Sequence, residues 1–463
     1  MRQPRPQPQP RPQPRPQPGK GPRLLWTPQW QVSWQRAQAE NNPWWQRIKA
    51  NADATGTDNE RYGDIGNWAA LAYQITGDKT YAAKAVTKLK QVLGAYSLAN
   101  IQNGWPNGDD SRQQFIEFVI LYDWLRPTLA EADRRFLLDK LNFIGDLCLD
   151  RVQEVSWGTR SGDSDEVVTH YFGLALLDLA TAGDNPRAGT FLTAKVRGEW
   201  PVGGLDATGA NRQTMRNEIA DYLRHAEGGN WLESSAYDLN TVNLFLLGYA
   251  GLRTVGGASH FPEFARFARQ AALAQIADLT PDLAQAYEWG DVQEPRGFSG
   301  PATLRYRMGL LATLAGLNRD DPEIAPALNR LIAELAHRYA DGYGRDPWPQ
   351  FFYLFDPYAP RATGLDRLPR VHYASGTGQF RYHTGWDVND SMFGAHMATH
   401  PFVDHTVSYF GDFQLYRKGE WALTHPLGYA SEANYGYGVN SMTIAGLSSL
   451  YDRHPVAEET GVG

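Results

Sequence analysis

A tyrosine near the middle of the chain stands among residue types that can carry out acid–base chemistry. Glu233 and Tyr237 are four residues apart in the segment His225-Ala-Glu-Gly-Gly-Asn-Trp-Leu-Glu-Ser-Ser-Ala-Tyr237. This spacing predicts that the segment opens a helix with both side chains on one face. Arg224 and His225 are positive neighbours that would pull the pKa of the phenol below its ordinary value of about 10. The other interpretation is an ordinary first helical turn with a packed tyrosine.

Histidines supply the other candidate acids and bases. His170 follows the polar run Ser161-Gly-Asp-Ser-Asp-Glu166, and we expect it to open a helix over 170–181. Its side chain could face a cleft or have a structural role in capping or packing. Five of the eleven histidines lie between His383 and His425. Such clustering suggests a metal, but the carboxylates that accompany histidine ligands are sparse there, so we expect none. His405, directly before a predicted strand, is the candidate general base.

The composition excludes several classes of protein. The chain has 463 residues, with 44 Lys and Arg against 51 Asp and Glu, a formal net charge of −7. A general nucleic-acid binder would show a basic face, and no apolar stretch approaches the roughly 20 residues of a membrane span. One cysteine, Cys148, excludes an internal disulfide framework and a cysteine-rich zinc module. Phosphate-binding glycine loops, the nucleophile elbow and the zinc-protease helix motif are also missing.

Three regions of the chain differ in their patterns. Residues 1–23 alternate Pro with Gln and Arg, which favours an extended arm without a core, and no signal peptide is visible there. Over 24–345, apolar residues recur three and four apart between Gly, Asp and Pro turns, which predicts serial helical hairpins. Such hairpins can form a bundle, a solenoid or a closed double ring of helices.

The remaining region, 346–463, has the period of strands. Lys418-Gly419 is predicted as a hairpin turn among five strands, at 380–383, 391–397, 406–416, 421–425 and 441–444. All-helix followed by all-strand predicts two domains, with a boundary between 345 and 375. Four to six strands are few for a closed sandwich, so we expect the second domain to be incomplete.

Bulky loops between the helices carry the candidate substrate contacts. The chain holds 15 Trp, 23 Tyr and 19 Phe, and loops as long as 200–231 and 284–300 are more often functional than not. Their arginines could pair with carboxylates or sulfates, and their tryptophans could stack on sugar rings. Each could equally anchor its loop. The predicted substrate-binding residues are Glu233, Trp231, Trp289, Arg212, Arg216 and Arg296.

Several stretches also occur in a particular order, Gly63–Asp78, Leu121–Leu129, Gly228–Tyr237, Arg381–Asp387, His405–Leu423 and Asn440–Gly446. In that order they resemble the heparinase II/III-like polysaccharide lyases and their alginate-lyase relatives. The resemblance implies an (α/α) toroid followed by an antiparallel β-sandwich, with the active cleft between the two. It also implies that a uronic-acid polysaccharide is cleaved by β-elimination, without a cofactor.

The resemblance implies a role for three residues. Tyr237 matches the family's catalytic tyrosine, as base or as acid to the leaving oxygen, and His405 matches the first histidine of a His-x-His strand motif, the partner base. His170 lies where the family has an Asn or His that binds or neutralises the substrate carboxylate. Val407 and Tyr409 depart from the residues that accompany a structural zinc in some relatives, which puts that metal in doubt.

Three functions stay open at this level. The first is a carbon–oxygen lyase acting on an anionic polysaccharide, expected in the periplasm or outside the cell because its substrate is a polymer. The second is an inverting glycoside hydrolase, with a carboxylate pair such as Glu233 and Asp291 about 6.5–9.5 Å apart. The third is a non-catalytic glycan-binding relative, suggested by Val407 and Tyr409.

Overall fold

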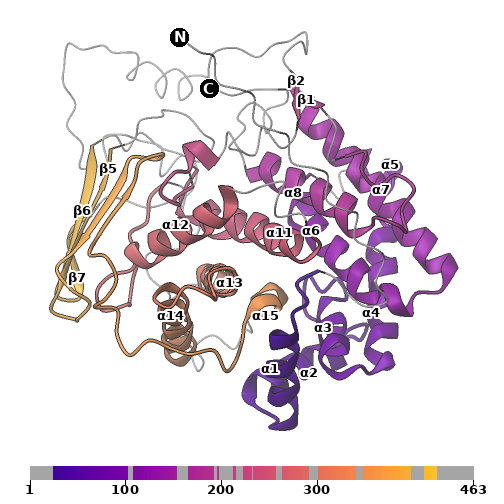
Figure 1. The fold of residues 1–463 in the computed structure, drawn as a ribbon, viewed down its shortest axis with the longest axis horizontal. Helices are drawn as coiled ribbons and strands as arrows, with labels where there is room; N and C mark the ends of the chain where they lie inside the picture. Colours follow the sequence, from indigo (N-terminus) through magenta and orange to yellow (C-terminus); the bar gives the residue numbers. More distant parts are fainter. Residues whose placement is uncertain are drawn as a thin grey trace, which may run out of the picture.

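Helices come first in this protein and a small antiparallel sheet follows them (Figure 1). The computed structural model describes residues 24–102, 108–153, 165–191, 195–197, 212–214, 223–231, 233–256, 263–290, 301–339, 348–397 and 411–424. The predicted arm, 1–23, and the predicted strand 441–444 lie outside these residues.

The helical part is built largely from neighbouring helices that pack in pairs along the chain, as the hairpin pattern predicts; α3 packs on α4 and α13 on α14. The helices are α1 Pro28–Ala39, α2 Pro43–Ala54, α3 Asn67–Thr76, α4 Lys79–Gly94, α5 Leu98–Gln102, α6 Gly108–Leu125, α7 Glu131–Gln153, α8 Asp165–Ala180, α10 Ser235–Tyr237, α11 Asn243–Thr254, α12 Glu263–Ala277, α13 Pro301–Leu317, α14 Ile324–Tyr339 and α15 Pro349–Leu354. A 3-10 turn, η1 (Arg126–Thr128), follows α6, and a π-helical turn, η3 (Asp238–Val242), follows α10.

Local signals explain where several of these helices begin and end. Thr27 caps α1 by accepting a hydrogen bond from the backbone N–H of Trp30 at 3.1 Å, and a proline follows it at the first helical position. Asn42 caps α2 in the same way. Gly77 ends α3 with a left-handed φ of 72°, a conformation that glycine adopts without strain.

The last helix returns to the first ones. Trp30 and Trp34 of α1 donate their indole N–H groups to the carbonyls of Phe352 and Phe355, at 3.2 and 3.1 Å. Helix α15 also packs on α3 and α13. The last described helix therefore ends at Leu354, inside the interval 345–375 in which the sequence predicts the boundary, and its aromatic residues pack with helices.

The sheet has five strands in the order β3-β4-β5-β6-β7, with antiparallel neighbours throughout. The strands are β3 Val371–Ala374, β4 Gln379–His383, β5 Ser391–His396, β6 Asp412–Arg417 and β7 Glu420–Leu423. Four of them overlap spans that the sequence predicts as strands, whereas β3 was not predicted. Lys418 and Gly419 form the predicted turn, with φ values of 51° and 85°. A separate two-stranded ladder pairs β1 (Lys195–Arg197) with β2 (Arg212–Thr214).

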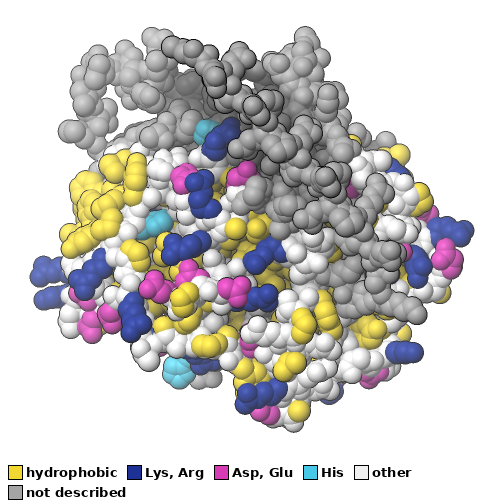
Figure 2. All heavy atoms as spheres, in the orientation of Figure 1, with side chains coloured by type: hydrophobic (Ala, Val, Ile, Leu, Met, Phe, Trp, Pro, Cys, Tyr) yellow, Lys and Arg dark blue, Asp and Glu magenta, His cyan; other side chains and the backbone are white. Residues whose placement is uncertain are grey.

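The two faces of the five-stranded sheet have opposite characters. The face against the helices buries polar side chains, among them Gln379, Arg381 and His383 of β4. The other face carries exposed apolar side chains, and hydrophobic residues gather over the sheet at the left of Figure 2. Register places Val371 opposite Tyr382 on this face. Sheets that face water usually show the reverse pattern.

Candidate functional site

The segment that leads to Tyr237 is held between α12 and the sheet. Gly228 and Gly229 have φ values of 99° and 94°, which favour glycine. A Cβ on Gly229 would lie 2.2 Å from the backbone of α12 at Ala271, and a Cβ on Gly228 would lie 2.2 Å from Ala374 of β3. The backbone N–H of Gly376 donates to the carbonyl of Glu227 at 2.8 Å. Only glycines allow the segment to approach both partners this closely.

Tyr237 is the last residue of α10, and its side chain is partly accessible. The π-helical turn η3 follows directly and packs against α8 and α13. Glu233 is fully buried at 0% exposure and lies in a bend before α10. The prediction that Glu233 and Tyr237 share one helical face is therefore wrong. The reason is that Ser235 donates its N–H to the carbonyl of Trp289 at 3.0 Å, so the helix begins only at Ser235.

A second chain segment joins Tyr237's neighbourhood to the sheet. Trp289 returns the contact to Ser235, because its backbone N–H donates to the serine hydroxyl at 2.8 Å. The Trp289 indole packs edge-on against the ring of His396, with 4.8 Å between centroids. His396 ends β5 and stands opposite Asp412 of β6 in the register. Thus α10, the loop before Trp289 and the ends of two strands meet at one place.

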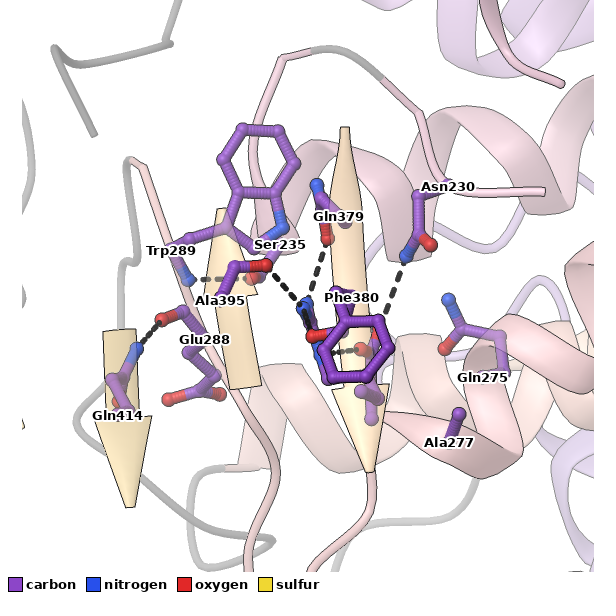
Figure 3. A network of polar contacts seen from close by, with 12 residues as sticks. Asn230, Ser235, Gln275, Ala277, Glu288, Trp289, Gln379, Phe380, Ala395 and Gln414 are labelled. Atoms are coloured by element: carbon purple, nitrogen blue, oxygen red, sulfur yellow. Dashed lines mark hydrogen bonds and ion pairs between the residues drawn. The ribbon is translucent and has the colours of Figure 1, made fainter. Parts of the chain in front are cut away.

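Arg381 is the centre of a polar network that includes Gln379 and, through Asp278, Asn230. Figure 3 shows Asn230 and Gln379 together with Ser235 and Trp289. The Arg381 Nε donates to Oδ1 of Asp278 at 2.7 Å, and the other carboxylate oxygen accepts from the amide of Asn230 at 3.3 Å. Further guanidinium hydrogen bonds reach the Gln379 side chain at 2.7 Å and the carbonyls of Phe380 and Ala395. The side chains of Arg381 and Asp278 are only 1% and 8% exposed, so their ion pair is buried.

Aromatic and imidazole groups complete the junction. The Arg381 guanidinium lies 3.5 Å from the ring centroid of Tyr287, and burial raises the pKa of that phenol above its ordinary value despite the nearby cation. Burial lowers the pKa of His383 to about 4, so its imidazole is neutral at neutral pH. His383 Nε2 donates to the carbonyl of Ala277 at 2.8 Å, which ties β4 to the end of α12.

The structure describes some of the predicted site residues and not others. His170 is 1% exposed and lies in the second turn of α8, which begins at Asp165 and not at 170 as predicted. Helix α8 packs on η3, the turn that directly follows Tyr237. Arg212 lies in β2. His405, Arg216, Arg296 and the alternative carboxylate Asp291 lie outside the described residues.

Trp231 and Trp289 are packed and do not form open platforms. Each is 1% exposed. The Trp231 indole lies 5.3 Å from the ring of Phe245, and Trp289 packs on His396. The structure therefore favours the loop-anchor interpretation of both over sugar stacking, because their faces already have protein partners.

Sequence reasoning missed the residues that join the two parts of the molecule. Asn230, Asp278, Arg381 and His396 were not singled out as site residues, although Arg381 stands in a stretch that carried the family resemblance. A signal was present in β4, where every second residue, Gln379, Arg381 and His383, is polar. Their side chains point toward the helices and are buried, whereas alternating polar residues ordinarily indicate the water-facing side of a strand.

Two general properties bear on the chemistry of the site. Among the residues that the structure describes, no three His, Cys, Asp or Glu side chains come together in a group that could hold a metal ion. Within the same residues, no helix has the length and apolar character needed to cross a membrane.

Comparisons with known proteins give remote structural similarities. No family model and no curated protein matches the chain. Among solved structures it is similar to heparinase III, with 13% identity over 79% of this chain and 50% of that one, at a TM-score of 0.47. It is also similar to the heparan sulfate lyase HepC from Pedobacter heparinus, with 14% identity, 85% and 59% coverage and a TM-score of 0.47. The chain thus spans between half and three fifths of the length of these structures.

Proposed function

We propose that this protein is a polysaccharide lyase that cleaves a uronic-acid-containing anionic polysaccharide by β-elimination. The main support for the proposal is the position of Tyr237, whose side chain is partly accessible. Tyr237 ends a short helix that hydrogen bonds between Ser235 and Trp289 fix where the helical part meets the sheet. The stretches that resemble heparinase II/III-like lyases include both sides of this junction, Gly228–Tyr237 and Arg381–Asp387.

Elimination needs few protein groups. The C5 proton of a uronate is weakly acidic because the adjacent carboxylate resists a second negative charge. A lyase must therefore neutralise the carboxylate with aimed donors, remove the proton, and protonate the departing glycosidic oxygen. We assign proton transfer to Tyr237 and His405 and carboxylate binding to His170. None of these steps calls for a cofactor.

The fold that goes with this proposal is an (α/α) toroid followed by a β-sandwich. The meeting of α1 and α15 supports a helical layer that closes on itself. The apolar outer face of the sheet supports a sandwich, because such a face is typical of a sheet that packs against a second layer. A polymer substrate further suggests that the protein acts in the periplasm or outside the cell.

The decisive experiment measures the products of the reaction. Heparan sulfate and alginate would be offered to the full chain, and an unsaturated uronate product would be detected by its ultraviolet absorbance. We expect Tyr237→Phe to reduce this rate by about 100-fold or more, since one general acid–base group contributes at least that much. Tyr373→Phe, at an exposed position on the outer face of β3, is the matched control and should keep full activity.

Other outcomes would overturn the proposal. Incorporation of labelled water into the new reducing end, with Tyr237→Phe still active, would indicate an inverting hydrolase. Tight binding of oligosaccharides without any turnover would indicate a non-catalytic glycan-binding protein.

A further inference from the structure

We propose that Arg381 is a positioning residue, which acts through Asp278 and Asn230 to fix the segment 228–237 relative to the sheet. The inference rests on the proposed function in one respect, that the segment carries the reacting phenol of Tyr237. The role is distinct from that of a residue that touches the substrate, because Arg381 is buried and its guanidinium already donates to Asp278, Gln379 and two backbone carbonyls.

Arg381 belongs to the sheet but is bonded to the helical part. It receives support from β4 and β5 through the carbonyls of Phe380 and Ala395, at 2.9 and 3.3 Å. It then donates to Asp278, which directly follows α12, at 2.7 Å. Planar guanidinium groups make such hydrogen bonds in fixed directions, so the contact sets an orientation as well as a distance.

The carboxylate of Asp278 also contacts the segment 228–237. Its other oxygen accepts from the side chain of Asn230 at 3.3 Å, and Asn230 is buried at 1% exposure. Asn230 lies directly after the two glycines that press against α12 and β3. One carboxylate therefore joins the sheet arginine to the start of the segment.

The other end of the segment, at Ser235, is also connected to Arg381 and Asp278. Ser235 is held by two hydrogen bonds to the backbone of Trp289. Two residues before Trp289 is Tyr287, whose ring lies under the Arg381 guanidinium and whose N–H donates to the carbonyl of Asp278 at 2.7 Å. Both ends of the stretch from Asn230 to Ser235 thus return to the same arginine and aspartate, immediately before Tyr237.

The test compares Arg381→Met with Arg126→Met in the full chain. Arg126 is the matched control because it also pairs with a carboxylate, Asp184, at 3.2 Å in a mostly buried setting, with a side chain 7% exposed. Its partner Asp184 lies in the turn after α8, outside the segment 228–237 and outside the sheet. Hydrogen exchange of peptides covering 223–237 is measured in the free protein, together with kcat and KM on a uronate polymer.

We expect Arg381→Met to speed exchange in 223–237 by about tenfold beyond any change elsewhere in the protein. In the same variant kcat should fall by about 100-fold with KM little changed, because a small misplacement of the reacting group slows the chemical step. Arg126→Met should change neither quantity. If both variants lose stability alike and leave exchange in 223–237 and kcat unchanged, Arg381 is only a structural anchor and the inference is wrong.

A second variant keeps the inference testable if Arg381→Met does not fold. Asn230→Ala removes the link from Asp278 to the segment but leaves the ion pair between Arg381 and Asp278 in place. We expect faster exchange in 223–237 and a lower kcat, and unchanged exchange would overturn the proposal. If the wild-type protein cleaves no polymer, the proposed function fails, while the exchange result still decides whether Arg381 positions the segment.

Discussion

Two contacts within this protein differ in kind. In one, the last helix, α15, packs against the first helices; in the other, α12 packs against the sheet. Where α1 and α2 adjoin α15, the contact is aromatic: Trp34 of α1 packs edge-on against Phe352 at 5.8 Å, and Trp44 of α2 lies 5.3 Å from Phe351. Where α12 adjoins the sheet, the central contact is the buried ion pair between Asp278 and Arg381. We call these the aromatic seam and the polar junction.

The difference teaches what each contact can do. Burial of aromatic rings removes apolar surface from contact with water. It stabilises the folded state in proportion to the area buried, with little dependence on the orientation of the rings. A buried ion pair adds little stability once the cost of desolvating both charges is included, but it demands one geometry. We therefore assign stability to the aromatic seam and orientation to the polar junction, beside which the candidate site lies.

The largest expected effect is at the aromatic seam. Trp34→Ala removes a side chain with 0% exposure and its hydrogen bond to Phe355, and we expect a loss of about 3–5 kcal/mol in the free energy of unfolding. Urea titration followed by circular dichroism measures this loss. Val32→Ala, on the exposed side of the same helix at 64% exposure, is the control and should be close to neutral. A small loss for Trp34→Ala would remove the basis of the comparison.

One buried carboxyl makes the aromatic seam sensitive to pH. Glu117 of α6 accepts hydrogen bonds from Tyr353 and Gln350 of α15, at 2.7 and 2.6 Å, and from Asn67 of α3 at 3.2 Å. Burial raises its pKa from 4.5 to about 7. The folded state therefore holds this proton more tightly than the unfolded state, and its contribution is fully present below about pH 4.5 and lost as the pH rises through 7, on the order of 3 kcal/mol in all.

The matched variant for this prediction is Glu117→Gln, which cannot ionise. Urea titrations at several pH values should show that the wild-type protein loses stability relative to Glu117→Gln between about pH 5 and pH 8. Equal pH dependence of the two proteins would mean that this carboxyl does not titrate in that interval.

At the polar junction, a double substitution should be milder than a single one. Arg381→Met alone leaves the charge of Asp278 buried, whereas Arg381→Met with Asp278→Asn removes both charges and keeps an acceptor for Asn230. We expect the double variant to recover about 2 kcal/mol of the free energy of unfolding relative to Arg381→Met. The aromatic seam should behave differently, since Trp34→Ala combined with Phe352→Ala gives no recovery. If the double variants recover unfolding free energy at both the polar junction and the aromatic seam, or at neither, the two contacts do not differ as we propose.

The smallest expected effect is at the solvent edge of the aromatic seam. Arg36 pairs with Glu40 at 2.8 Å and lies over the ring of Tyr358 at 4.0 Å, but its side chain is 60% exposed. Exposed ion pairs contribute little because water screens them, so Arg36→Ala should leave the midpoint of thermal unfolding unchanged. A clear fall would mean that an exposed ion pair also stabilises the aromatic seam.

Most of the individual elements could be predicted from the sequence. The serial helical hairpins predicted for 24–345 correspond to neighbouring helices that pack together, such as α13 and α14, because the apolar period and the flanking turns are local signals. Strand β3 was missed because His372 and Tyr373 do not alternate clearly with their neighbours.

The candidate site was less predictable than the elements. The four-residue spacing of Glu233 and Tyr237 suggested a shared helical face, yet a hydrogen bond to Trp289, 54 residues away, delays the helix to Ser235. Similarly, the aromatic run 351–355 gave no sign that it would join the helices rather than the strands. Both outcomes depend on partners that are distant in the sequence.

The sequence by itself determined the order of helices and strands, the positions of several caps and turns, and the presence of a tyrosine with acid–base neighbours. Only the tertiary structure decided that polar residues of β4 face inward and that Arg381, Asp278 and Asn230 meet. The physical reason is that periodicity and capping act within a few residues, whereas a buried charge is tolerated only when its partner, more than a hundred residues away here, arrives with the correct geometry.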